Sequence, residues 1–235
     1  SFGDWLGLLA TTALAQELSG GNYKRANFAI AGVFIVRLLP AVFLGPIAGV
    51  IADRFDRRRL MILCDILRFA LYLSIPLVGN YLWLYTATVL VETVTLFWSP
   101  AKEASVPNLV PKNKLESANQ VSLLAAYGTA PIAALIFSLL ALFSAGFTNF
   151  IPSKYASTAD LALYIDALSF LYTAWVVFGL KEIPRGASSE SASQQNIGKS
   201  LVEGFKFVNS SKLIRGLIFG MLGAFFAAGA VIGLA

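Results

Sequence analysis

The chain has 235 residues, of which 57% are hydrophobic and 13% are charged, and its mean hydropathy is +0.71. Soluble globular domains are roughly 45–50% apolar and about 25% charged, so this composition predicts a helical membrane protein with several spans. The net charge of +5 could indicate nucleic-acid binding, but the basic residues cluster at the ends of apolar segments. That placement is typical of membrane topology signals and of contacts with anionic lipids.

Cysteine and histidine usage narrows the chemistry further. Cys64 is the one cysteine, so no internal disulfide can form, and the chain contains no histidine. Histidine-based catalysis, histidine proton relays and most transition-metal sites are therefore excluded. The sequence also lacks a nucleophile elbow, a phosphate-binding loop and a cluster of metal ligands. We therefore expect no cofactor and no enzymatic activity.

Six apolar segments, long enough to be membrane helices or nearly so, follow one another in the first three quarters of the chain. The first ends at the turn signal Ser19-Gly20-Gly21-Asn22, and it is short for a span of about 20 residues. Together these segments predict an all-α fold with a six-helix transmembrane bundle over residues 1–180. The expected segments are 2–18, 26–52, 58–78, 81–98, 115–143 and 159–180.

The connection between the fourth and fifth segments carries its own signals. Ser99-Pro100 is typical of a helix cap followed by proline at the first helical position. We therefore expect residues 100–114 to form a polar loop with a short helix. Asn113 followed by Glu116 resembles a capping box and predicts the start of the fifth segment.

The remaining quarter of the chain changes character. Residues 181–212 are expected to form a linker that begins rich in Ser, Gln and Gly and ends in an amphipathic helix at about 200–209. Residues 213–235 are apolar again and are still apolar at Ala235. We expect them to be the start of a second bundle, cut off within its first helix, unless the protein is a true half-length member of its class.

The distribution of basic residues predicts the orientation. Six of the seven residues from Asp53 to Arg59 are charged. If this loop is cytoplasmic, the three regions on its side of the membrane hold thirteen lysines and arginines, against three on the other side. Because lysine and arginine resist translocation, the 53–59 loop and the 181–212 linker are expected in the cytoplasm.

The same loop resembles a known family. Residues 49–58 read Gly-Val-Ile-Ala-Asp-Arg-Phe-Asp-Arg-Arg, similar to the pattern G-x-L-A-D-R-x-G-R-K between the second and third helices of the major facilitator superfamily. Ile51 stands in place of the leucine and Asp56 in place of the second glycine. The resemblance implies the N-terminal half of a fold with twelve helices, in which two bundles enclose a central path and move by alternating access.

Further stretches resemble the enterobactin and macrolide exporters of that superfamily. Residues 99–110, which come after the fourth segment, are similar to the P-A-x-x-A-x-x-P-x-L-V loop of that group, and residues 115–119 continue the match. Gly3-Asp4-Trp5 resembles the G-D-W in helix one, and Gly128 to Ala134 is a degraded match to an antiporter motif. The resemblance implies an exporter of a hydrophobic or amphipathic small molecule, such as a drug or a siderophore.

The resemblance also implies a role for the charged loop. In the family, the aspartate and the basic residues after it form a cytoplasmic latch that holds the two halves together when the outer side is open. The residues of this chain that match the latch motif are Gly49, Asp53, Arg54, Arg57 and Arg58. The alternative is a turn capped by Asp56 with a basic topology signal.

Several charged residues fall within the expected spans, where an unpaired charge costs several kcal/mol and is a functional candidate by default. Asp4, Arg37 and Glu92 lie deepest, and we expect them to line the cavity and to bind a proton or substrate. The alternative for the same residues is a structural salt bridge between helices. Asp65 and Arg68 are three residues apart on one helix and are expected to form a structural pair. Asp166 lies near the outer end of its segment and is expected to reach water.

Two repeats of the form Gly-x-x-x-Gly, at Gly45–Gly49 and Gly229–Gly233, indicate close helix packing. The partners expected for the protein are a small-molecule substrate, protons, membrane lipids, and either the C-terminal half of the transporter or a separate subunit. No nucleic acid is expected. The alternative function is a membrane subunit that does not transport but uses a half-transporter fold to bind another complex or lipid.

Overall fold

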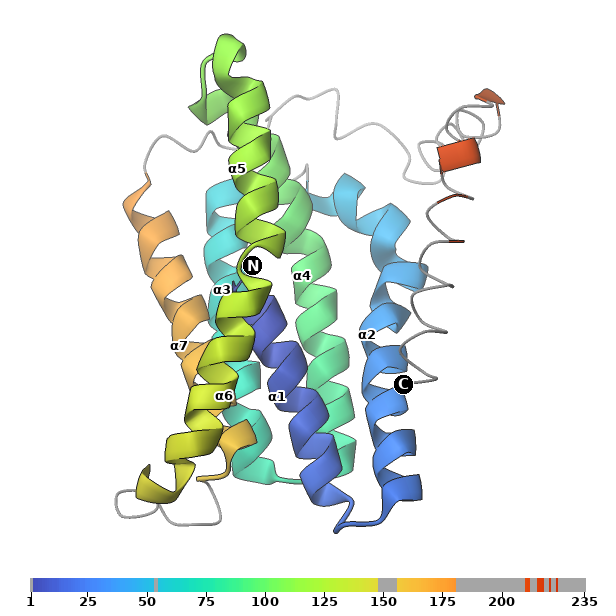
Figure 1. Ribbon diagram of the computed structural model, residues 1–235. Coiled ribbons are helices and arrows are strands. Elements are labelled where there is room, and N and C mark those ends of the chain that lie inside the picture. Colours follow the sequence, from blue (N-terminus) through green and yellow to red (C-terminus); the bar gives the residue numbers. More distant parts are fainter. Residues whose placement is uncertain are drawn as a thin grey trace. The chain divides into compact units, whose positions relative to one another are not determined.

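The computed structural model describes residues 2–52, 55–147 and 156–180, together with residues 210–211, 215–217, 220 and 223 (Figure 1). The chain divides into two units, Ser1–Ser188 and Ser189–Ala235. In the second unit residues 215–217 are helical, while the expected amphipathic helix at 200–209 lies outside the described residues. The first unit holds the long helices of the described residues.

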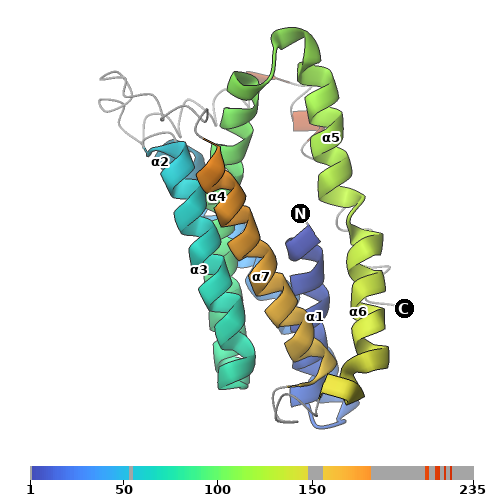
Figure 2. The same ribbon diagram turned by 90° about the vertical axis from the view of Figure 1, so that its left-hand side faces the viewer.

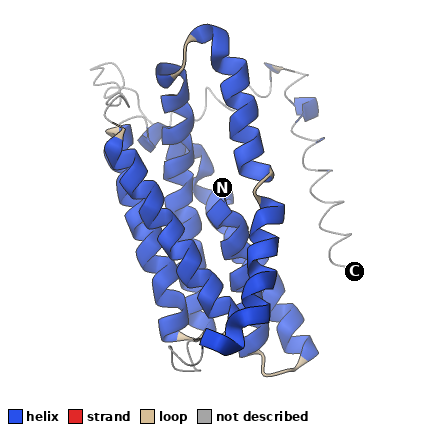
Figure 3. Ribbon diagram, turned by 60° about the vertical axis from the view of Figure 1, so that its left-hand side comes forward, coloured by secondary structure: helices blue, strands red, loops and turns tan. Residues whose placement is uncertain are grey.

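The described part of the first unit is helical, with loops and turns between helices (Figure 3). Five of its helical stretches are long and apolar enough to cross a membrane, and one of them, Lys112–Ser144, comprises a 3₁₀ turn and two consecutive helices. The prediction of an all-helical membrane protein with several spans is confirmed. The predicted count of six spans is not confirmed, because five stretches qualify in the described part of the chain and α1, with 17 residues, is short for a span. The elements are α1 (Phe2–Leu18), α2 (Tyr23–Ala52), α3 (Arg57–Val78), α4 (Tyr81–Leu109), the 3₁₀ turn η1 (Lys112–Lys114), α5 (Leu115–Tyr127), α6 (Ala130–Phe147) and α7 (Thr158–Gly179).

Polar side chains fix where several helices begin and end. Asp56 caps α3 by accepting a hydrogen bond from the backbone N–H of Arg59 at 3.0 Å, and Asn80 caps α4 in the same way. Ser157 and Asp160 form a reciprocal capping box at the start of α7. Gly79 ends α3 with φ 62°, a left-handed conformation that favours glycine. These local signals hold the short connections in place.

The region after Trp98 departs from expectation. α4 continues through Pro100 and Pro107 to Leu109, so the predicted loop over residues 100–114 is largely helix. Its extra turns are held by burial, since Ala101 is 1% exposed and packs in a small cluster with Met61 and Val177. Tertiary packing here outweighs the proline signals.

The fifth segment also differs from its prediction. It is two helices, α5 and α6, separated at Gly128-Thr129. Pro131 lies just after the break and has no N–H to continue the hydrogen-bond ladder. The predicted capping box is wrong, because the residue before α5 is Lys114, which makes no side-chain cap.

α1 lies in the middle of the unit. It contacts α2, α4, α6 and α7, while α7 also packs along α3 and α2 packs along α4 (Figures 1 and 2). Small residues such as Ala10 and Ala15, both 0% exposed, allow its neighbours to approach closely. By contrast, a Cβ at Gly45 of α2 would meet nothing within 4 Å among the described residues, so the predicted close packing is not seen at Gly45; the Gly229–Gly233 repeat lies outside the described residues.

Candidate functional site

Two oppositely charged side chains meet in the middle of α2 and α4. The Nη2 atom of Arg37 lies 2.7 Å from Oε1 of Glu92. The two side chains keep 16% and 19% of their surface exposed, so the pair is largely enclosed but not fully buried. An ion pair at this depth satisfies two charges that would each be costly alone in a membrane span.

Asp4, in the first turn of α1, lies near this pair. It acts electrostatically on both Arg37 and Glu92. The structure therefore brings together the three residues that the sequence predicts as cavity candidates. The group holds one guanidinium and two carboxylates, so it offers both signs of charge to a ligand, a proton or a neighbouring helix.

A second charged pair lies deeper, on α3. Asp65 and Arg68 are 3.2 Å apart with 0% and 1% of their side chains exposed. The indole N–H of Trp98 donates to Oδ2 of Asp65 at 3.2 Å. The Arg68 guanidinium stands over two rings, 4.7 Å from the centroid of Trp98 and 4.8 Å from that of Phe170. Because these rings belong to α4 and α7, the pair joins three helices through cation–π contacts.

Asp166 of α7 is buried, which contradicts the expectation that it reaches water. Its side chain is 0% exposed and faces α1 at Gly3 and Gly7. Tyr72 of α3, which is stacked on Phe170 at 5.5 Å, lies beside it. The helical spacing of Ala162, Asp166 and Phe170 is the signal that could have placed Asp166 on the buried face.

Two arginines at the start of α3, Arg57 and Arg58, contact other helices of the first unit. Nη1 of Arg57 donates to the carbonyl of Ala104 in α4 at 3.0 Å. Arg58 donates to the carbonyls of Val177 and Phe178 near the end of α7, and its guanidinium lies over the Phe178 ring. Arginine satisfies the unpaired carbonyls of a helix C-terminus and suits its negative dipole end.

The structure says less about the other three residues of the expected latch. Asp53 and Arg54 lie outside the described residues, and Gly49 is known only as part of α2. Within the described part of the chain, Arg57 thus binds α4 and Arg58 binds α7 of their own unit.

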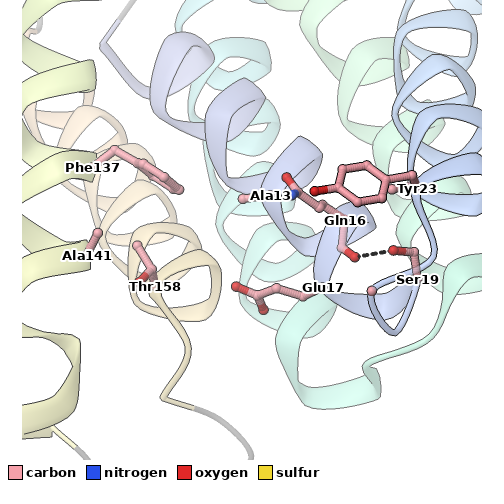
Figure 4. Close-up of a pocket in the computed structure, with 10 residues that line it drawn as sticks. Ala13, Gln16, Glu17, Ser19, Tyr23, Phe137, Ala141 and Thr158 are labelled. Carbon is pink, nitrogen blue, oxygen red and sulfur yellow. Dashed lines mark hydrogen bonds between the residues drawn. The ribbon is translucent and has the colours of Figure 1, made fainter.

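A pocket of about 510 Å³ opens at the other end of the unit, between α1, α2, α6 and α7 (Figure 4). Glu17 and Gln16 come from the last turn of α1, and Phe137 faces them from α6. The hydroxyl of Ser19 donates to the carbonyl of Gln16 at 2.6 Å, which fixes the turn that leads to α2. The sequence does not predict this pocket, since its lining comes from distant segments.

Apolar helices that enclose charged pairs define the class of this protein. Charges within membrane spans are rare and are functional candidates by default, so the class is that of polytopic membrane proteins with charged groups inside the bundle. Residues 1–235 match the family described as transmembrane secretion effectors, and the chain belongs to this family of the major facilitator superfamily.

Known relatives agree with this assignment. The chain is 29% identical over 219 residues to YfiS of Bacillus subtilis strain 168, an uncharacterised transporter of the superfamily, covering 91% of this chain and 48% of YfiS. It is 23% identical over 206 residues to BacE of the same organism, named provisionally as a bacilysin exporter, covering 86% of this chain and 47% of BacE. It is 30% identical over 91 residues to macrolide efflux protein A of Enterococcus faecalis, covering 37% of this chain and 28% of that protein.

The chain spans about half the length of the first two of these relatives. No solved structure matched it. The family assignment therefore rests on the sequence match along the whole chain, and the geometry of the first unit shows which charged residues lie between its helices.

Proposed function

We propose that this chain is the N-terminal half of a secondary active exporter that moves a hydrophobic or amphipathic small molecule by alternating access, coupled to protons. The observation that carries the proposal is the match of the whole chain to the transmembrane secretion effectors. The names of BacE and macrolide efflux protein A support export and a substrate of drug-like size.

In this proposal, α1, α2, α3, α4, the pair α5–α6, and α7 are the six spans of the first bundle, within residues 1–180. Residues 181–212 form the linker, and 213–235 begin the second bundle, which supplies the other wall of the path. The Asp53–Arg59 loop and the linker face the cytoplasm of a bacterial inner membrane, as the excess of lysine and arginine on that side supports.

Asp4, Arg37 and Glu92 are proposed to line the substrate path. The Arg37–Glu92 pair keeps part of its side-chain surface exposed, so a charged ligand or water can reach it. An ion pair that is accessible from only one face at a time can exchange its partner for a substrate or a proton during the transport cycle. Asp4 adds a second carboxylate within electrostatic reach of Arg37.

The latch proposal concerns Gly49, Asp53, Arg54, Arg57 and Arg58. The carboxylate of Asp53 would hold the second bundle closed on the cytoplasmic side, by accepting N–H groups at a helix N-terminus. Arg57 and Arg58 would hold the loop in position by joining it to α4 and α7. Their contacts with Ala104 and Val177 are consistent with this role.

The test measures accumulation of a macrolide and an amphipathic dye in drug-sensitive bacteria that express the full-length transporter. Accumulation should fall relative to cells with an empty vector, and Asp53→Asn should restore most of it at equal membrane content. The matched control is Asp56→Asn, which removes a charge from the same loop but keeps an N-cap residue for α3.

Equal accumulation in expressing and empty-vector cells, across a panel of such compounds, would overturn the exporter. Normal efflux by Asp53→Asn would overturn the latch alone.

A further inference from the structure

A groove of about 580 Å³ lies between α3 and α7. The two helices pack along each other (Figure 2). Apolar and aromatic side chains line the groove, and most of them are exposed among the described residues, including Leu168, Trp175 and Phe178 of α7. In a membrane-spanning unit such side chains face lipid, because acyl chains are as apolar as leucine. The groove is therefore open to the hydrocarbon of the bilayer.

One end of the groove meets an exposed arginine. Ile62 and Ile66 line the groove from α3. Arg59 lies three residues before Ile62 and seven before Ile66, so the three residues share one face of α3. Arg59 is exposed, and within the described part of the chain its guanidinium makes no ion pair. Its charge is therefore available to a ligand in the groove.

A second arginine of α3 borders the same end. The guanidinium of Arg58 lies 5.4 Å from the ring centroid of Phe178, which lines the groove from α7. Arg58 also donates to backbone carbonyls of α7, so part of its hydrogen-bonding capacity is already used. The carboxylate at this end belongs to Asp56, the N-cap of α3. With three arginines and one aspartate, residues 56–59 give this end a net positive charge.

The length of the groove matches one leaflet of a bilayer. Its lining on α7 runs from Leu168 to Phe178, and ten residues of helix rise by roughly 15 Å, half of a hydrocarbon core of about 30 Å. Trp175 lies one turn before the end of α7, near the arginines, and tryptophan rings in membrane proteins favour the level of the headgroups. The order along the groove is therefore that of a phospholipid: a charged end, an interfacial ring, then apolar side chains.

We propose that this groove binds one anionic phospholipid, with an acyl chain along Ile66 and Leu171 and its phosphate at the guanidinium of Arg59. A phosphate forms charge-assisted hydrogen bonds with a guanidinium group. The net positive charge of this end favours a headgroup with a net negative charge over one that also carries an ammonium group. The groove lies on α3 and α7, whereas the Arg37–Glu92 pair joins α2 and α4, so the inference does not depend on export.

A second copy of the chain suits this groove less well than lipid does. Two copies inserted in the same orientation and joined through this face would bring both sets of arginines to the same end of a shared interface. Like charges at that end would repel each other, whereas an anionic headgroup neutralises them. The charge pattern thus favours lipid over self-association.

The first test is native mass spectrometry of the full-length transporter in detergent, with phosphatidylglycerol and phosphatidylcholine that carry identical acyl chains. Wild type should bind one phosphatidylglycerol in preference to phosphatidylcholine. Arg59→Gln should lower this preference about fivefold, which corresponds to about 1 kcal/mol for one arginine near an anionic headgroup. The matched control is Arg25→Gln, which removes an exposed arginine at the start of α2 and should leave the preference unchanged.

An equal preference in wild type and Arg59→Gln would overturn the proposal. A dimer in place of the lipid adduct would assign the groove to a second copy of the chain and would overturn it as well.

The second test locates the acyl chain with phosphatidylglycerol brominated on its acyl chains, because bromine quenches the fluorescence of nearby tryptophan. The full-length transporter is placed in phosphatidylcholine vesicles that contain a small share of this lipid. Quenching should be weaker in Trp175→Phe and in Arg59→Gln than in wild type, and Arg25→Gln should match wild type. Equal quenching in all four proteins would place the lipid elsewhere and contradict the proposed site.

Discussion

At the scale of single residues, the main question is whether Arg37 and Glu92 hold the bundle together or take part in transport. Their 2.7 Å contact fits both, and so does their partial exposure. Removing one partner leaves a lone charge in a membrane span, which costs up to roughly 3–5 kcal/mol when the pair is fully buried and less here. The two roles separate when both charges are removed together.

We predict that Arg37→Gln and Glu92→Gln each lower the free energy of unfolding, and that the double variant recovers most of this loss. Efflux should stay low in the double variant, because the groups that exchange partners during transport are gone. Stability is measured by denaturant titration in detergent and efflux by dye release from cells. Normal efflux in the double variant would show that the pair is structural.

At the scale of elements, the N-terminal half of α1 organises the unit. Gly3 and Gly7 face Asp166, Asp4 acts on the Arg37–Glu92 pair, and Trp5 reaches the break between α5 and α6. Any movement of α1 therefore changes the surroundings of both the charged group and the broken helix. Two substitutions on this helix are informative.

Gly7→Ala should destabilise the fold by about 1–3 kcal/mol, because overpacking forces Asp166 or Tyr72 to shift. The matched control is Gly45→Ala on α2, where a Cβ meets nothing within 4 Å and alanine favours the helix. The measurement is the midpoint of thermal unfolding in detergent for both variants. A Gly7→Ala protein as stable as Gly45→Ala would show that α1 and α7 pack more loosely than these distances indicate.

Trp5→Phe should cost about 1 kcal/mol by removing the hydrogen bond from the indole N–H to the carbonyl of Ala126 at 2.7 Å. That carbonyl lies beside the helix break, where the ladder is already interrupted. Trp175→Phe on α7 is the control, since Trp175 is 70% exposed. Equal unfolding midpoints in the two variants would mean that the bond contributes nothing to stability.

The helix bounds show which parts of the fold could be predicted from the sequence. Hydropathy locates the apolar segments, and the Asp56 cap is visible in the sequence, because both depend on residues close in the chain. The extension of α4 past Pro100 is not visible there, because it is held by packing of Ala101 against Met61 and Val177. The split of the fifth segment at Gly128 has a local proline and glycine signal, but the continuous apolar run over residues 115–143 favours a single segment.

The candidate site, too, is only partly predictable from the sequence. Asp4, Arg37 and Glu92 can be selected because charges are rare in apolar segments. The sequence cannot show that Arg37 pairs with Glu92, since helix order alone does not fix which faces meet. The prediction for Asp166 is wrong because it depends on the distance from the helix end, whereas the face on which the residue lies decides its burial.

At the scale of the whole molecule, one bundle cannot enclose a path by itself. The chain matches its family along its full length yet covers about half of YfiS and BacE. The proposed transport cycle therefore needs a second bundle that supplies the other wall of the path. The most direct test must use the complete transporter.

That test is directional transport by the purified full-length protein in proteoliposomes, measured with an amphipathic fluorescent dye under an imposed pH gradient. We predict that the dye accumulates against its own gradient, and that collapsing the pH gradient with a protonophore stops the accumulation. Dye movement that merely equilibrates across the membrane, unaffected by the pH gradient, would contradict proton-coupled export.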